Sequence, residues 1–193
     1  YSEEITTEAV HIGFERERIF PIGIFALPRF DFGEYVRLVH SHISILSNTC
    51  WGGLTYHSLS MQFRSPLINM FEMEEDYLKL LRAPKDYFNK KLQFDRWGYT
   101  EDRPAYPICR LGDIDLHCNH YRTMQEVEEK WYARASRINY DNIFVMMLAQ
   151  DVRSLEAFAA LPYQKKICFT PFSSTYDCVC TLQFAVARAG GEE

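Results

Sequence analysis

A glycine-rich loop that carries a cysteine is the first place in the sequence where the residue types could do chemistry. Residues 47–53 read SNTCWGG, follow the apolar run 43–46 and precede His57. Loops at the carboxyl ends of sheet strands commonly bind ligands in α/β proteins, because free backbone N–H groups converge there. A thiol in such a loop acts as a nucleophile when an imidazole accepts its proton. We therefore expect Cys50 as nucleophile, with His57 or a more distant histidine as base.

The neighbours of Cys50 are the expected substrate-binding residues of this loop. The two glycines permit close approach of the backbone to a ligand, and an N–H group there could donate to an oxyanion. The alternative is that Cys50 and Trp51 fill the core beneath a tight turn. The candidates expected to bind substrate here are Asn48, Trp51, Gly52 and Gly53.

Acidic and imidazole side chains gather in residues 112–121. In a strand, Asp113, Asp115 and His117 would alternate onto one face. A carboxylate beside an imidazole can orient a general base, or such groups can hold a divalent metal. The histidines lack the helical H-E-x-x-H spacing of a zinc site, and a solvated strand face explains the polar side equally, so we expect no metal. His120 is the catalytic candidate of this segment, with a structural role as the alternative.

Three basic residues share one face of the clearest expected helix. Lys130, Arg134 and Arg137 are spaced at i, i+4 and i+7, an arrangement that could clamp a phosphate or a carboxylate. Asn139 and Asp141 follow in the turn before a buried strand, and we include them with Arg134 and Arg137 among the expected substrate-binding residues. The alternative is an ordinary solvated helix face followed by turn-forming residues.

The composition is that of a mildly acidic globular chain. The 193 residues carry 21 Lys plus Arg and 26 Asp plus Glu, a formal net charge of −5, and 47% of them are apolar. This charge disfavours broad attraction to nucleic acid or to anionic lipid. No apolar run approaches the ~20 residues that a membrane-spanning helix needs. We therefore expect neither a nucleic-acid partner nor a membrane span, and the oligomeric state is left open.

Cysteine usage favours a reducing compartment. The six cysteines include no matched C-x-x-C pairs of a structural zinc site, and several stand inside apolar runs. Buried thiols are therefore expected rather than disulfides. This favours the cytoplasm, with peripheral attachment to the inner face of a membrane left open. Because the chain begins with Tyr1 rather than Met, we also expect a fragment or a trimmed chain.

The hydrophobic pattern predicts short strands that alternate with helices. Thr123 and Glu126 form a capping box that marks the start of the clearest helix. Strands buried on both faces and alternating with helices are typical of an α/β layered sandwich with a mostly parallel, Rossmann-like sheet and helices on both faces. The aromatic and proline content of 87–107 suggests a long loop or insertion. The expected elements are strands over 43–46, 65–71, 142–148 and 166–170, a hairpin or bent strand over 108–118, and helices over 74–81, 124–138 and 154–161.

Three parts are expected along the chain: an irregular lead-in over 1–34, an α/β domain over 35–172 and an irregular tail over 173–193.

Four blocks of the sequence resemble a bacterial family of unknown-function domains commonly labelled exopolysaccharide biosynthesis protein. The family usually has Asn at the position of Thr49 and an apolar pair at Cys118-Asn119, so this chain departs from its pattern there. The resemblance implies an α/β fold, a place among proteins that build capsular and secreted glycans, and Asn69 as a further substrate-binding candidate. It implies no particular reaction. The blocks are Ser47-Asn48-Thr49-Cys50-Trp51-Gly52-Gly53, Ser65-Pro66-x-Ile68-Asn69, Gly112-Asp113-Ile114 with His120-Tyr121, and Lys130-Trp131-x-x-Arg134-x-x-Arg137-Ile138-Asn139-x-Asp141-Asn142.

Together these features predict a transferase that acts on a cell-surface glycan or its precursor. Acyl transfer is slightly preferred over glycosyl transfer, because a cysteine beside a histidine suits thioester or ester chemistry. The expected donors are acyl-coenzyme A or a nucleotide sugar, whose diphosphate Arg134 and Arg137 could hold. In a doubly wound sheet, Cys50, His57, His120 and Arg137 would meet at one edge. The alternatives are a non-enzymatic glycan-binding or assembly module, or an inactive copy.

Overall fold

The computed structural model describes residues 31–100 and 103–182. The irregular lead-in expected over 1–34 lies outside the described residues except for 31–34, and the tail expected over 173–193 lies outside them from residue 183 onward.

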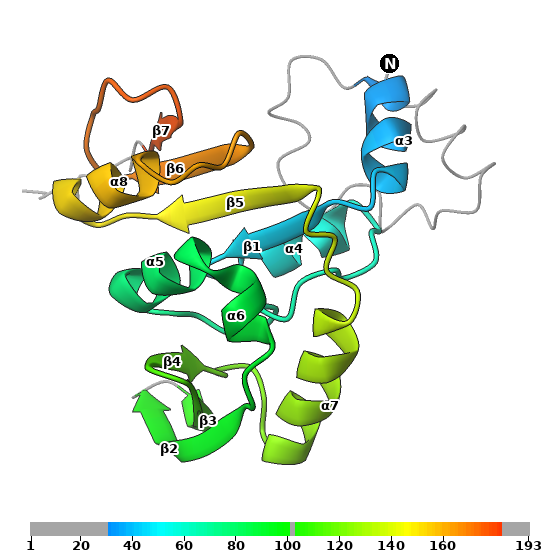
Figure 1. Cartoon of the computed structure of the whole chain (residues 1–193), viewed down its shortest axis with the longest axis vertical. Coiled ribbons are helices and arrows are strands. Elements are labelled where there is room, and N and C mark those ends of the chain that lie inside the picture. Colours follow the sequence, from blue (N-terminus) through cyan, green and yellow to red (C-terminus); the bar gives the residue numbers. More distant parts are fainter. Residues whose placement is uncertain (1–30, 101–102, 183–193) are drawn as a thin grey trace, which may run out of the picture.

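A sheet of four parallel strands forms the upper part of the molecule in Figure 1. Its strand order is β1-β5-β6-β7, so every neighbouring pair requires a crossover connection. The first three strands were expected from their apolar runs. The short fourth strand was not, because the sequence has no clear period there. The strands are β1 (Ser44–Ser47), β5 (Ile143–Leu148), β6 (Lys166–Thr170) and β7 (Val179–Thr181).

A second, antiparallel sheet lies apart from the first, with α5 and α6 between the two (Figure 1). Its strands are β2 (Gln93–Thr100), β3 (Arg103–Leu111) and β4 (Ile114–His117). The hairpin expected around Gly112 is present, with Leu111 paired to Ile114 and Gly112 at φ +69°. The prediction of a long loop over 87–107 is wrong, because β2 and part of β3 occupy these residues. The fold is therefore mixed α/β with two separate sheets.

Capping side chains mark the starts of three of the described helices, at Asp31, Thr123 and Asp151. The Thr123 hydroxyl accepts a hydrogen bond from the Glu126 N–H group at 3.2 Å, as the capping box predicts, and Asp151 caps the last helix in the same way. No helix in 31–100 or 103–182 combines the length and apolar character that crossing a bilayer requires. The helices are α3 (Phe32–His40), α4 (Trp51–Ser58), α5 (Glu74–Arg82), α6 (Pro84–Phe88), α7 (Met124–Ala135) and α8 (Val152–Ala159).

The strand expected over 65–71 is irregular backbone. Only Phe71 pairs, in an isolated antiparallel bridge with His117. Pro66 cannot donate to a ladder and Asn69 has φ +64°, so the apolar residues of this segment fill the core without forming a strand.

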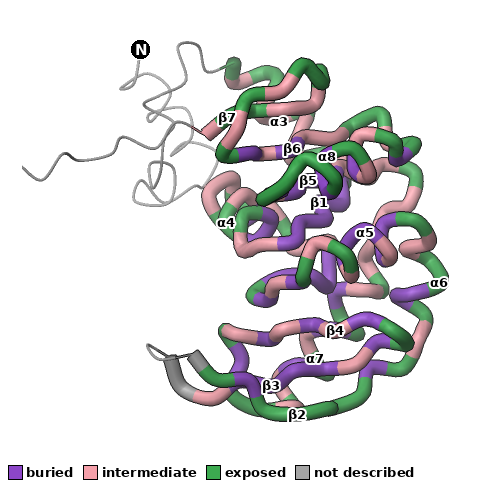
Figure 2. The backbone as a smooth tube through the Cα atoms, turned by 90° about the vertical axis from the view of Figure 1, so that its left-hand side faces the viewer, coloured by how far each residue is buried: buried purple, intermediate pink, exposed green. Residues whose placement is uncertain are grey.

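Two apolar clusters use alternate residues of the parallel strands. Ile45 and Met146 pack with Tyr56 of α4, whereas Leu46 and Val145 belong to a larger cluster that includes α5, α8 and the antiparallel sheet. Figure 2 shows this buried centre along β1 and β5. Side chains alternate across a strand, so strands with apolar residues at every position can serve both clusters.

Tyr56 satisfies the outer edge of β1. This strand pairs with β5 on one side only. On the other side, the Tyr56 hydroxyl accepts a hydrogen bond from the Ile45 N–H group at 2.7 Å and donates to the Ile43 carbonyl at 3.1 Å. The phenol is fully buried, and burial raises its pKa to about 12. One side chain of α4 thus replaces a missing neighbouring strand.

Replacing Tyr56 by Phe tests this edge. The Tyr56→Phe variant leaves a buried N–H and a buried C=O group without partners, which costs ~1 to 3 kcal/mol of the free energy of unfolding. Urea denaturation followed by circular dichroism measures the loss. The Tyr99→Phe variant removes an exposed phenol and is the control. Equal stability of the two variants would contradict the role given to Tyr56.

Candidate active site at the carboxyl edge of the parallel sheet

Cys50 and His120 lie side by side although they are far apart in the sequence. The Cys50 Sγ atom is 3.3 Å from the His120 Nε2 atom. Cys50 is the N-cap residue of α4, directly after β1, and His120 lies in the turn that follows β4. A thiol at a helix N-terminus beside an imidazole is the setting in which cysteine acts as a nucleophile. Of the two histidines predicted as base, the distant one is the partner.

The segment Phe71–Glu72 joins the two parts of the chain that carry this pair. Phe71 and His117 exchange two backbone hydrogen bonds of 3.0 Å, and the Glu72 N–H group donates to the Asn48 carbonyl at 3.3 Å. One extended dipeptide therefore contacts both the strand end before Cys50 and the strand end before His120.

Both glycines after Cys50 are closely packed. A Cβ atom on Gly52 would lie 3.1 Å from the Ser47 Cβ atom, and one on Gly53 would lie 3.3 Å from the Ile68 Cγ2 atom. Glycine thus lets the start of α4 lie close to β1 at Gly52 and close to Ile68 at Gly53 without displacing these neighbours. As the second and third residues of the helix, these glycines have N–H groups without intrahelical acceptors. Those donors lie in the first turn after Cys50.

Three other predicted residues surround this helix start. The Asn48 amide donates to the Leu148 carbonyl at 3.1 Å and accepts from the Leu148 N–H group at 2.9 Å, so it fastens β1 to the end of β5. Trp51 is 39% exposed and packs edge-on against Phe169 at 4.1 Å between ring centroids. Asn69 is exposed, and its Oδ1 atom would be 3.9 Å from a Cβ on Gly53.

His57 and Arg134 lie elsewhere. His57 is exposed in the last turn of α4, seven residues or about 10 Å along the helix from Cys50. Arg134 is only 6% exposed, and its Nη1 atom donates to the Tyr121 hydroxyl at 2.6 Å and to the Ile68 carbonyl at 3.4 Å. The Arg134 guanidinium is therefore held inside the protein and is not presented to a ligand at the surface.

The remaining predicted residues lie at the opposite, amino edge of the parallel sheet. The Asn139 N–H group donates to the Ser44 hydroxyl, which belongs to the first residue of β1. The Asp141 N–H group donates to the Asn139 side chain, a turn-forming contact, and the Arg137 Nε atom donates to the Ala133 carbonyl at 2.8 Å. The structure therefore does not bring Arg137 to the edge that holds Cys50, contrary to the predicted convergence.

The acidic strand segment is held by its own neighbours. Asp113 accepts a hydrogen bond from the Tyr87 hydroxyl at 2.7 Å, which lowers the pKa of this carboxyl group. His117 stacks on Phe71, and burial lowers the pKa of the imidazole. Within the described ranges, no three His, Cys, Asp or Glu side chains gather in a way that could hold a metal ion. All six cysteines lie in those ranges, and none forms a disulfide.

Glu72 is a buried residue that the sequence pattern did not reveal. It is 3% exposed, and both of its carboxylate oxygens lack a hydrogen-bond partner within the described structure. Burial, with a smaller contribution from Asp76, raises the pKa of Glu72 well above 4.5. In the sequence, Glu72 stands close to the acids of the first turn of α5. Such a group of acids is typical of a solvated helix start.

The chain belongs to the family described as Domain of unknown function (DUF1919), whose model matches residues 23–185. An uncharacterized protein of Haemophilus influenzae is 31% identical to it over 137 residues, which cover 69% of this chain and 64% of that relative. The aligned region thus spans a little under two thirds of the relative's own length.

The Glu72→Gln variant tests the buried acid. The folded protein holds the Glu72 proton to higher pH than the unfolded chain does, so wild-type stability falls as the pH rises above about 4.5. The uncharged amide carries no such penalty. The variant should therefore be more stable than wild type at pH 8, with the difference shrinking towards pH 4.5 and constant below it.

Guanidinium denaturation at several pH values measures this difference. The Glu75→Gln variant, which changes an exposed neighbouring acid, is the control and should follow the wild-type curve. A Glu72→Gln curve parallel to wild type from pH 4.5 to 8 would show that Glu72 is ionised and compensated in the folded protein.

Proposed function

We propose that this protein is a transferase of exopolysaccharide or capsular glycan biosynthesis that transfers an acyl group through Cys50. The observation that carries the proposal is the 3.3 Å approach of the Cys50 thiol to the His120 imidazole at the N-terminus of α4. The glycan assignment comes from the family resemblance of the sequence blocks. The acyl assignment comes from the chemistry of this pair.

The reaction needs a base, a nucleophile and an oxyanion donor. His120 takes the Cys50 proton, and the thiolate attacks the carbonyl carbon of an acyl thioester such as acyl-coenzyme A. The N–H groups of Gly52 and Gly53 are the candidate donors to the oxyanion. The C–S bond to the leaving thiol breaks, the leaving thiolate takes the proton from His120, and the acyl group remains on Cys50.

The second half returns the enzyme to its starting state. A hydroxyl of the glycan acceptor gives its proton to His120 and attacks the acyl-Cys50 carbonyl carbon. The bond to Cys50 breaks, and the thiolate recovers the proton. Trp51 and Asn69 are the candidate acceptor-binding residues, because an exposed indole offers an apolar face and an exposed amide offers both a donor and an acceptor. The proposed location of the protein is the cytoplasm. The alternative is peripheral attachment of the protein to the inner face of a membrane.

Thiol reactivity is the first test of the pair. Cys50 should react with iodoacetamide at pH 7 about tenfold faster than the exposed Cys180 of the same chain, because His120 favours its thiolate. The His120→Ala variant should lose this advantage, and His57→Ala should keep it. Mass spectrometry of tryptic peptides measures each rate. Equal rates at Cys50 and Cys180 in the wild type would contradict a nucleophilic Cys50.

A donor screen tests the reaction class. Incubation with acyl-coenzyme A donors should add the mass of the acyl group to the wild type and not to Cys50→Ala, and a tightly bound donor should raise the melting temperature. Stabilisation by a nucleotide sugar that persists in Cys50→Ala would instead support glycosyl transfer. No response to any donor, with slow alkylation of Cys50, would leave a glycan-binding module or an inactive copy.

A further inference from the structure

A continuous set of hydrogen bonds holds cationic side chains along the amino edge of the parallel sheet, opposite Cys50. The Lys165 Nζ atom donates to the Asn142 Oδ1 atom at 2.6 Å, and the Asn142 Nδ2 atom donates to the Ser41 carbonyl at 2.9 Å. Lys165 and Asn142 directly precede β6 and β5, and Ser41 precedes β1.

Two arginines continue this set from neighbouring loops. The Arg64 Nη2 atom donates to the His42 Nδ1 atom at 2.9 Å, and the Arg64 Nη1 atom donates to the Arg137 carbonyl at 3.3 Å. Arg137 in turn bonds the Ala133 carbonyl at the end of α7. His42 itself adopts a left-handed backbone conformation, with φ +53°. The basic edge, as we call Arg64, Arg137, Lys165 and His42, therefore has its side chains fixed by neutral acceptors.

The charge of the basic edge is not neutralised within the described part of the chain. The ion pairs among the described residues join other side chains, and none includes Arg64, Arg137 or Lys165. By contrast, Lys79, Arg96, Arg110 and Lys130 all pair with carboxylates. Other described cations, such as Arg82, Lys85 and Arg153, also lie outside these ion pairs, and Asp141 lies at the same edge, so the distinguishing feature of the basic edge is that neutral acceptors hold its cations in place.

The two guanidinium groups retain most of their donors. Each carries five N–H groups, and the hydrogen bonds described above use two of them on Arg64 and one on Arg137. Side chains that are already held in place lose little conformational entropy when a ligand arrives. A tetrahedral oxyanion offers several oxygens to such donors, and a phosphate at pH 7 carries a charge of about −1.5 to −2.

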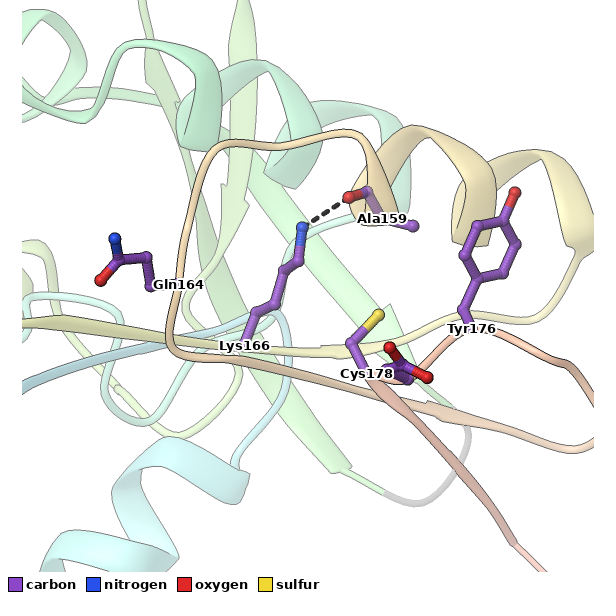
Figure 3. A pocket seen from close by; sticks show the side chains of 6 residues that line it. Ala159, Gln164, Lys166, Tyr176 and Cys178 are labelled. Carbon is purple, nitrogen blue, oxygen red and sulfur yellow. Dashed lines mark hydrogen bonds between the residues drawn. The ribbon is translucent and has the colours of Figure 1, made fainter.

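A neighbouring hollow at the same edge lacks these features. It measures about 340 Å³ and is lined by Lys166, Asp177 and Cys178 among others. Figure 3 shows Lys166 reaching towards Ala159, and its Nζ atom bonds the carbonyls of Ala159 and Leu161 at the end of α8. Lys166 is thus engaged as a helix cap, and Asp177 adds a negative charge. An anion would therefore be bound more strongly beside Arg64, where N–H donors are available.

We propose that Arg64 and Arg137, with Lys165 and His42 beside them, bind a phosphate group, free or as a phosphate ester. β1 is four residues long, so this site and Cys50 are separated by about 13 Å along the sheet. It is a binding site apart from the Cys50 reaction and does not depend on the function proposed above.

Phosphate binding to charge-neutral variants tests the site. Isothermal titration of the full chain with inorganic phosphate and with pyrophosphate, at constant ionic strength, should show saturable binding to the wild type. Arg64→Gln and Arg137→Gln should each weaken it about tenfold, the usual loss for one charge-assisted hydrogen bond. Arg82→Gln removes an exposed cation of α5 and should bind as the wild type does. Circular dichroism confirms folding, and Lys165→Gln, a lysine with an exposed head, provides an independent variant.

A second arm identifies the source of the phosphate. Flotation with phosphatidylglycerol vesicles, compared with phosphatidylcholine vesicles, asks whether a lipid headgroup occupies the basic edge. Binding to anionic vesicles that Arg137→Gln abolishes assigns a membrane phosphate, and saturable pyrophosphate binding without vesicle binding assigns a soluble one. Either result supports the proposal. Absence of both, or equal losses in Arg82→Gln and Arg137→Gln, would overturn it.

Discussion

The bridge made by Phe71 and Glu72 is the constraint on which the candidate active site depends. Cys50 follows a strand of the parallel sheet, and His120 follows a strand of the antiparallel sheet, so neither sheet alone could fix their separation. The reciprocal Phe71–His117 backbone bonds and the Glu72–Asn48 bond join the two strand ends directly. These are main-chain contacts, and the stacked Phe71 and His117 rings add to them. The 3.3 Å approach of thiol and imidazole is thus set by backbone geometry rather than by two long side chains reaching across a gap.

Two buried ionisable side chains lie at this bridge and differ in their hydrogen-bond partners. Tyr121 and Ile68 accept hydrogen bonds from Arg134, and the Phe63 ring lies 5.0 Å from its guanidinium carbon. Arg134 ties α7 to the segment that leads into the bridge. Glu72 has no such partners, and a carboxylate without donors in an apolar site is far more costly than a carboxylic acid. At the junction of the two strand ends, burial thus raises the pKa of Glu72, whereas the buried guanidinium of Arg134 lies where acceptors exist.

The sequence predicted those parts of the fold that local patterns determine. Apolar runs located β1, β5 and β6, and the Thr123 capping box located the start of α7. The antiparallel strand β2 was missed because Gly98 and nearby prolines mark loops in most sequences; here Gly98 makes room for the Tyr106 ring, 2.6 Å from where a Cβ would stand. The sequence allowed a distant histidine as the partner of Cys50 but could not choose it over His57, because His57 is near in sequence and only tertiary contacts bring His120 to Cys50. No sequence pattern identified Glu72 as buried, because a single buried acid leaves no periodic pattern in the sequence.

The length of β1 is an argument for acyl transfer over glycosyl transfer in the function proposed above. A single phosphate cannot contact Arg137 and approach Cys50 at once, since the two edges are about 13 Å apart along the sheet. Arg134 cannot substitute for Arg137, because it is only 6% exposed and bonds Tyr121 and Ile68 inside the protein. The helical face that would have held a nucleotide diphosphate for glycosyl transfer is therefore divided: Lys130 pairs with Glu126, Arg134 is buried, and Arg137 faces another edge. What remains at Cys50 is a thiol, an imidazole and the N–H groups of a helix start. These groups serve carbonyl chemistry, for which no diphosphate clamp is required at the reacting atoms.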